Sequence, residues 1–188
     1  IVLPMLPRVE PAAARPATAP PTNAEATRDE AAARLGRAVH RVLEWLPTTP
    51  VALERACAAA AQEFGLAADA APRIAAIANA VLTSADCRRF FDPAQIAWAG
   101  NEVTIVWRGE TLRIDRLVAL RGVGEEGVEG GAREWWVLDY KLQHAPAEVA
   151  AYRAQLAGYR EAVAGLQAGE RVRAGLVTGR GEVIEVGA

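Results

Sequence analysis

The hydrophobic pattern of this chain changes its period near the middle, and this change restricts the fold more than any other feature. Up to about residue 84, apolar side chains recur at the three- and four-residue spacing of amphipathic helices. From about residue 102, apolar and polar residues alternate as they do in half-buried strands. The order of helices, strands, one helix and two more strands predicts an α/β domain with a small central mixed β-sheet flanked by helices.

The first half of the chain predicts an arm followed by three helices. Residues 1–22 contain six prolines and few large apolar side chains, which is typical of an extended linker or arm. Helices are predicted over residues 24–46, 51–65 and 71–84, with Pro47 ending the first and Gly65 the second. We therefore expect one globular domain over residues 23–188. The chain lacks an initiator Met, so we expect a fragment of a longer protein.

The second half predicts two hairpins separated by a helix. Strands in residues 102–107 and 110–120 lie on either side of Arg108-Gly109, a pair suited to a tight turn. A glycine-rich segment, residues 121–133, predicts a mobile loop that leads into a strand over 134–142. A helix from about Pro146 to Leu166 and two short strands, in residues 171–178 and 182–186, complete the pattern.

The strand that reads WWVLDYKL ends in two charged residues on one face. Because side chains alternate across a sheet, Asp139 and Lys141 point to the same side, about 7 Å apart at their Cα atoms. Asp115 stands among apolar residues of the preceding strand and would converge on Asp139 if the two strands pair. Two carboxylates suit Mg²⁺, and a nearby lysine can orient or deprotonate an attacking water. The plainer alternative is a solvated strand end with a surface ion pair.

Two further groups of polar side chains lie on predicted helices. His40 precedes Glu44 by four residues on one helical face, although a histidine beside an apolar stripe is more often a hydrogen-bonded core residue. Tyr152, Gln155 and Tyr159 share one side of a later helix, where a packing stripe with a polar edge would explain them equally well.

Taken in order, the segments GRAVHRVLE, NEV, LRIDRLV, VLDYKL and YRAQLAGY resemble the RecB-type branch of the PD-(D/E)XK nuclease superfamily. The closest likeness is to the C-terminal nuclease domain of AddA and RecB helicase-nuclease subunits, over residues 34–178. The resemblance implies a restriction-endonuclease-like fold and a metal-dependent DNA nuclease. It also implies a role in DNA end processing and recombinational repair.

The resemblance also implies roles for individual residues. His40, Asp115, Asp139 and the backbone carbonyl of Tyr140 would bind the metal, which is Mg²⁺ with Mn²⁺ as a substitute. Lys141 would act on the attacking water, and a further pair, Gln155 and Tyr159, would support the site and the DNA strand. Glu102 matches a frequent acidic position of the family but is not expected to be a ligand. The four-cysteine signature of some relatives is missing, so no iron–sulfur cluster is expected.

Composition limits the setting and the partners. Two distant cysteines, Cys57 and Cys87, indicate a reducing, cytoplasmic location, and no apolar stretch is long enough to cross a membrane. A net charge of −2 predicts weak, salt-sensitive DNA binding, helped by a local basic rim. The residues expected in this rim are Arg88, Arg89, Arg108, Arg113 and Arg116. The chain has no P-loop, so a helicase motor would lie elsewhere in the parent chain. The resemblance also implies a second helicase-nuclease subunit as a partner.

Two other functions compete with catalysis. One is a catalytically inactive module that binds DNA or docks to a helicase, and the other is a purely structural appendage. The combination of Asp115, Asp139 and Lys141 argues against both, because neither function needs this set of side chains.

Overall fold

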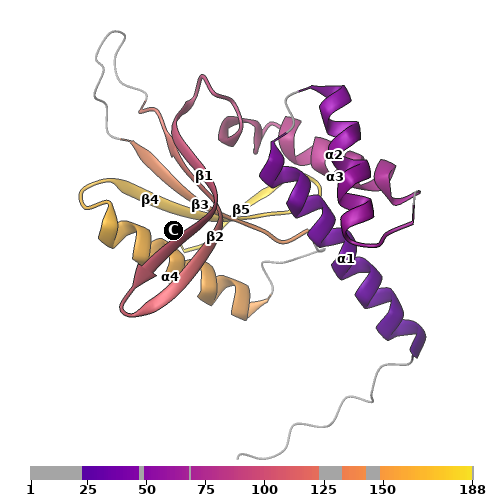
Figure 1. Ribbon diagram of the computed structural model, residues 1–188. Coiled ribbons are helices and arrows are strands. Elements are labelled where there is room, and N and C mark those ends of the chain that lie inside the picture. Colours follow the sequence, from indigo (N-terminus) through magenta and orange to yellow (C-terminus); the bar gives the residue numbers. More distant parts are fainter. Residues whose placement is uncertain (1–22, 47–48, 68, 123–132, 143–148, 188) are drawn as a thin grey trace, which may run out of the picture.

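The computed structural model describes residues 23–46, 49–67, 69–122, 133–142 and 149–187 (Figure 1). The predicted arm, most of the glycine-rich segment and the predicted helix start at Pro146 lie outside these residues. The helices are α1 (Asn23–Trp45), α2 (Pro50–Glu63), α3 (Ala70–Thr83), the short 3₁₀ helix η1 (Arg88–Phe90) and α4 (Ala150–Leu166). The strands are β1 (Ile96–Trp107), β2 (Glu110–Leu120), β3 (Glu134–Tyr140), β4 (Arg171–Val177) and β5 (Val183–Glu185).

The first three helices agree with the sequence prediction to within two residues at each end. The start of α2 shows why helix ends can be predicted from sequence. Thr49 caps the helix by accepting a hydrogen bond from the Ala52 amide at 3.1 Å, and Pro50 occupies its first turn. Strand β1 begins six residues earlier than predicted, at Ile96. The sequence of its first part, IAWAG, is rich in alanine and glycine, which have little β-propensity, so only pairing with β2 shows it to be a strand.

The five strands form one mixed sheet in the order β1-β2-β3-β4-β5. Strands β1, β2 and β3 are antiparallel neighbours, β4 lies parallel to β3, and β5 lies antiparallel to β4. Helix α4 makes the crossover that the parallel pair requires. This confirms the predicted α/β fold with a small mixed sheet flanked by helices.

The sheet separates two apolar cores, one on each face, and helices lie on both sides of it (Figure 1). Helices α1, α2 and α3 cover one face, where Trp136 and Leu138 of β3 meet buried side chains such as Val39, Val42 and Leu43. Helix α4 covers the other face, where Leu156 and Val163 pack against side chains that include Trp135 and Val137. The strict alternation predicted for β3 is therefore confirmed, and it places Asp139 on the α4 side.

The β1–β2 hairpin changes the face that it buries partway along its length. Strict alternation predicted that Ile114 and Val118 would share a face, but Ile114 packs in the α4-side core with Leu117, while Val118 packs on the α1 side. Between the paired residues Asn101 and Val103 of β1 stands Glu102, with a left-handed φ of 51°. The register is the same on both sides of Glu102, so this residue adopts its unusual backbone angle without a bulge, next to the place where the buried face changes.

The hairpin turn itself forms as predicted. Trp107 pairs with Glu110, and the two residues between them, Arg108 and Gly109, have φ values of 50° and 83°. Positive φ at both central positions is the geometry of a type I′ turn, in which glycine is favoured.

Among the described residues, no helix combines the length and the apolar character that a membrane span needs.

Candidate active site

Helix α1 supplies His40 and Glu44 to the space between the helices and the sheet. The helix is fixed by fully buried residues between them and before them, including Val39, Val42 and Leu43. His40 and Glu44 lie one turn apart beside this stripe, with side chains 26% and 15% exposed. Each is therefore held by a packed helix while its side chain stays partly exposed, unlike the fully buried side chains of the stripe.

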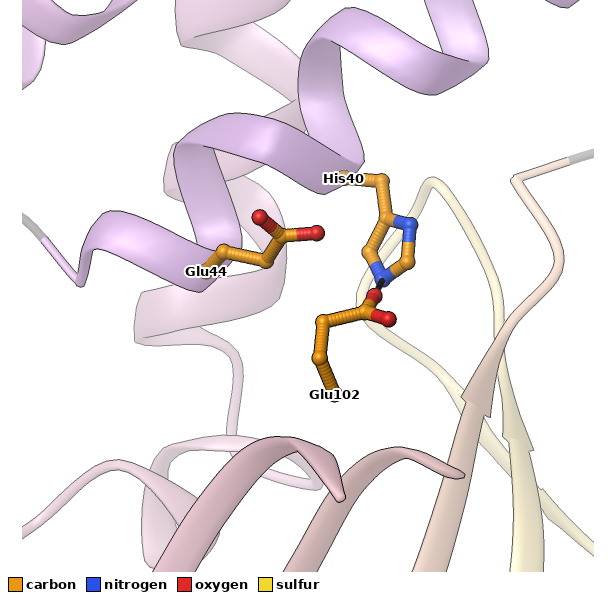
Figure 2. A group of neighbouring side chains, drawn as sticks. All are labelled: His40, Glu44 and Glu102. Atoms are coloured by element: carbon orange, nitrogen blue, oxygen red, sulfur yellow. Dashed lines mark ion pairs between the residues drawn. The ribbon is translucent and has the colours of Figure 1, made fainter. Parts of the chain in front are cut away.

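Glu102 faces His40 from strand β1 (Figure 2). Its Oε1 lies 3.0 Å from His40 Nε2, and its carboxylate also contacts Arg113. Ligand atoms of His40, Glu44 and Glu102 all lie within 4.8 Å of one another. Glu102 was not expected to be a ligand, but it belongs to a group of side chains that could hold a cation.

Asp115 and Asp139 converge because β2 and β3 pair as antiparallel neighbours. Arg116 pairs with Leu138. Because the strands are antiparallel, Asp115, which precedes Arg116, lies beside Asp139, which follows Leu138. Asp115 Oδ2 accepts a hydrogen bond from the Tyr140 amide at 2.8 Å, and Asp115 Oδ1 lies 3.8 Å from His40 Nε2. The convergence that the sequence made conditional on this pairing is therefore present in the structure.

Lys141 lies against Asp139 at the end of β3. Its Nζ is 2.6 Å from Asp139 Oδ2 and 4.9 Å from the centre of the Tyr152 ring. The Lys141 amide donates to the Val177 carbonyl at 3.0 Å, so the neighbouring strand β4 fixes its backbone. Asp139 is buried and Lys141 is 20% exposed at its side chain, which excludes the solvated surface pair considered as the plainer alternative.

The remaining predicted site residues have more varied surroundings. Tyr140 is buried on the α1 side, with its ring centre 5.3 Å from that of His40, and burial raises the pKa of its hydroxyl. Gln155 donates to the Tyr159 hydroxyl at 2.8 Å on α4. Within the described part of the chain, no hydrogen bond or ion pair joins Gln155 or Tyr159 to Asp115, Asp139 or Lys141. Their support of the site stays a prediction.

The prediction that Arg116 belongs to a basic rim on the surface is wrong. Arg116 is 2% exposed and donates hydrogen bonds to the Phe90 carbonyl at 3.1 and 2.7 Å and to Asn101 Oδ1 at 2.6 Å. Asn101 in turn donates to the Glu44 carbonyl at 2.9 Å. The guanidinium is satisfied inside the fold, where it joins β2 to β1 and to the end of α1. It is a structural cation beside Asp115 and is not available to DNA.

Burial and like charge change the titration of Asp115. Removal from water is the main reason why the pKa of its carboxyl is raised to about 6, and the nearby Asp139 carboxylate acts in the same direction. His40, the hydrogen bond from the Tyr140 amide and Lys141 act in the opposite direction. Two carboxylates therefore lie close together in the site, and their repulsion lowers the stability of the fold. An added positive charge would reduce this repulsion.

The donor set fits a divalent cation. His40 Nε2 and Asp139 Oδ2 are shielded from solvent and have no well-aligned hydrogen-bond partner among the described residues, despite their close charged neighbours. Asp115 and Asp139 offer the hard oxygen ligands that Mg²⁺ and Mn²⁺ prefer, and the imidazole of His40 suits Mn²⁺ as well. These side chains could hold one such ion, with Glu102 and Glu44 as additional carboxylates on the His40 side.

Without metal, the protein should lose stability as the pH rises from about 4 to above 6. Because the folded chain keeps a proton on Asp115 up to a pKa of about 6, it binds more protons than the unfolded chain in this window. The free energy of unfolding should fall by at most about 3 kcal/mol as that proton is lost. Urea denaturation at a series of pH values, with a chelator present, measures this change.

Asp115→Asn is the matched variant for this experiment, because its amide oxygen can still accept from the Tyr140 amide. The variant should lack this part of the pH dependence and should be more stable than the wild type at neutral pH. If the free energies of unfolding of the two proteins change in parallel over the whole pH range, the pKa of Asp115 is not raised by folding.

Comparison with known proteins agrees with this arrangement. A family model described as the PD-(D/E)XK nuclease superfamily matches residues 15–183, which include every element from α1 to the first residue of β5. A search among curated proteins gave no significant match. The matched region contains the converging pair Asp115 and Asp139 and the adjacent Lys141, set on a mixed sheet between two helical layers. The chain belongs to the PD-(D/E)XK nuclease superfamily, whose members are generally metal-dependent nucleases.

Proposed function

We propose that this protein is a Mg²⁺-dependent deoxyribonuclease that hydrolyses phosphodiester bonds. The observation that carries the proposal is the meeting of Asp115, Asp139 and Lys141 at one end of the paired β2 and β3 strands, with His40 facing them from α1. A structural domain would not need two carboxylates and a shielded imidazole in one place, because such groups are costly to bury without partners.

Each residue has a distinct task in this proposal. Asp115, Asp139 and His40 hold the cation, and the Tyr140 carbonyl is the fourth protein group that the family resemblance suggests. When bound, Mg²⁺ would neutralise charge that develops on the scissile phosphate and favour ionisation of the attacking water. Lys141 is held beside Asp139 by ion pairing and by the fixed β3 backbone, so its ammonium group can orient that water.

Helix α4 contributes a second layer to the proposed site. Tyr152 supports the Lys141 ammonium through its ring face at 4.9 Å, which limits the positions that the lysine can occupy. Gln155 and Tyr159, joined by their hydrogen bond, lie farther along the same helix and would contact the DNA strand that enters the site.

The biological setting is proposed from the sequence resemblance alone. As a nuclease domain of the AddA and RecB type, the chain would work with a helicase portion of its parent chain and a second helicase-nuclease subunit. It would process DNA ends for recombinational repair in the cytoplasm. The helicase would feed a strand to the site and so raise the effective DNA concentration there.

The test is cleavage of an end-labelled linear DNA by the purified chain. We expect products to form with Mg²⁺ or Mn²⁺ and to disappear when a chelator removes the ion, because Asp115 and Asp139 would otherwise face the phosphate with like charge. Internal labelling of a second DNA separates digestion from an end from cutting within the strand. DNA binding without cleavage at any concentration of either ion would support the inactive module instead.

A further inference from the structure

A groove leads away from the candidate active site between α1 and α3. Its volume is about 1060 Å³, and its inner end is formed by His40, Tyr140 and Lys141. One wall is the stretch 31–39 of α1, and the opposite wall is made by the chain from Gly65 into the first half of α3. Anything that lies along this groove therefore reaches His40, Tyr140 and Lys141 of the proposed site.

The charges along the groove are mostly positive. Arg34, Arg37 and Arg73 line it together with Lys141, and Asp69 is the one carboxylate in its lining within the described residues. Among the described residues, five arginines elsewhere pair with carboxylates, namely Arg41, Arg108, Arg113, Arg171 and Arg173. Within the part of the chain that the structure describes, Arg34, Arg37 and Arg73 have no such pair.

Arg34 provides an independent sign that the groove is built for an anion. Its Nε is shielded from solvent and has no hydrogen-bond partner in the described structure. A guanidinium that is partly removed from water is normally satisfied by a carboxylate, a carbonyl or a phosphate. Arg34 and Arg37 are separated by about 4.5 Å along the axis of α1, so the basic wall continues toward His40.

The size and the apolar lining favour one strand over two. Pockets that enclose molecules of drug size span about 300–1,000 Å³, so this groove holds a few nucleotides. In a duplex the faces of the bases are stacked on one another, so only a single strand can place them against the apolar lining of this groove. Small residues along α1, such as Ala33 and Gly36, keep the groove open, and Leu35, Leu66 and Ile77 offer apolar surface for bases.

We propose that this groove binds a single DNA strand, with Arg34, Arg37 and Arg73 on its phosphates, and guides it to the active site. The inference rests on the proposed nuclease function and adds to it the strandedness of the substrate and its path. It also reconciles a net charge of −2 with DNA binding, because the positive charge needed is concentrated along one groove.

The test compares DNA binding by two triple variants that lose the same charge. The groove variant is Arg34→Ala, Arg37→Ala, Arg73→Ala, and the control is Arg55→Ala, Arg121→Ala, Arg133→Ala, whose three side chains are exposed and outside the groove lining. Fluorescence anisotropy with labelled oligodeoxythymidylate, in chelator to prevent cleavage, gives the affinity over a range of salt concentrations. Thermal unfolding shows whether each variant folds.

For single strands, each phosphate contact contributes about 0.7 to the slope of log affinity against log salt concentration. The groove variant should therefore lose about 2 from this slope and bind the oligonucleotide more weakly, whereas the control should keep most of the wild-type slope. A labelled hairpin duplex should bind weakly to all three proteins. Equal losses in the two variants, or equal losses for duplex and single strand, would overturn the proposal.

Because Arg34 is half-buried, the double variant Arg37→Ala, Arg73→Ala is the second test if the triple variant does not fold. Both of its side chains are exposed, and we expect a loss of about 1.4 from the slope. Failure of this inference is distinguishable from failure of the nuclease proposal. If the wild type cleaves DNA with metal and the groove variant keeps the wild-type salt slope, only the proposed strand path is wrong. If the groove variant loses salt slope but the wild type does not cleave DNA, only the proposed nuclease activity is wrong.

Discussion

Asp139→Ala should reduce metal-dependent DNA cleavage by about a thousandfold or more. Asp139 is buried beside Asp115, and its loss takes away one of the two carboxylates that can hold the cation between β2 and β3. A bound metal supplies several kcal/mol of transition-state stabilisation, and a loss of about 4 kcal/mol corresponds to three powers of ten in rate. Single-turnover cleavage of a labelled linear DNA at saturating Mg²⁺ measures the effect.

The matched control for this variant is Asp86→Ala, which removes an exposed carboxylate outside the site. It should cleave DNA at the wild-type rate, and thermal unfolding should show that both variants fold. The Asp139 variant should also bind Mn²⁺ more weakly by calorimetry, because the metal and the reaction depend on the same carboxylate. Wild-type cleavage by Asp139→Ala would place the active site elsewhere in the molecule.

Lys141→Ala should separate catalysis from metal binding. The ammonium lies 2.6 Å from Asp139, so its removal takes a positive charge away from the carboxylates and should leave the affinity for Mn²⁺ unchanged or slightly increased. Cleavage should nevertheless fall by about 100-fold or more, which is the usual contribution of a positioned group that acts on the transferred proton or the water. Calorimetry and single-turnover kinetics on the same protein give the two quantities.

Lys141→Arg is the conservative companion to that variant. It keeps the charge near Asp139 but replaces a compact ammonium with a planar group that stays protonated, so we expect little recovery of the rate. If Lys141→Ala instead weakens Mn²⁺ binding and cleavage in proportion, the lysine only organises Asp139. An unchanged cleavage rate in Lys141→Ala would leave it as a partner of Asp139 without a role in the reaction.

The elements that the sequence predicted well are those with a strong local signal. Helix α2 has a capping threonine and a proline at its start, and the tight turn at Arg108-Gly109 has a glycine where positive φ is required. The first part of β1 carries no such signal, because its alanines and glycine become a strand only by pairing with β2. The change of buried face near Asp115, between Ile114 and Val118, breaks the strand alternation on which a sequence prediction relies.

Some residues of the candidate site could likewise be predicted from sequence, and others could not. Asp115, Asp139 and Lys141 lie on neighbouring strands, so alternation and pairing were enough to predict that they meet. Glu44 and Glu102 reach the same place from α1 and β1, which are far apart in sequence, and the packing of helix against sheet had to be known. Arg116 was misplaced on the surface because a pattern of charges does not reveal the Phe90 carbonyl and the Asn101 side chain that satisfy it inside.

The backbone at Glu102 has a consequence for the evolution of this protein. A left-handed residue other than glycine typically costs about 1–3 kcal/mol, and glycine at this position would relieve that cost. The same substitution would delete the carboxylate that lies 3.0 Å from His40. Selection for stability alone would therefore move position 102 toward glycine, whereas selection for the site opposes it. A redesign that places glycine at position 102 for stability would therefore weaken the active site.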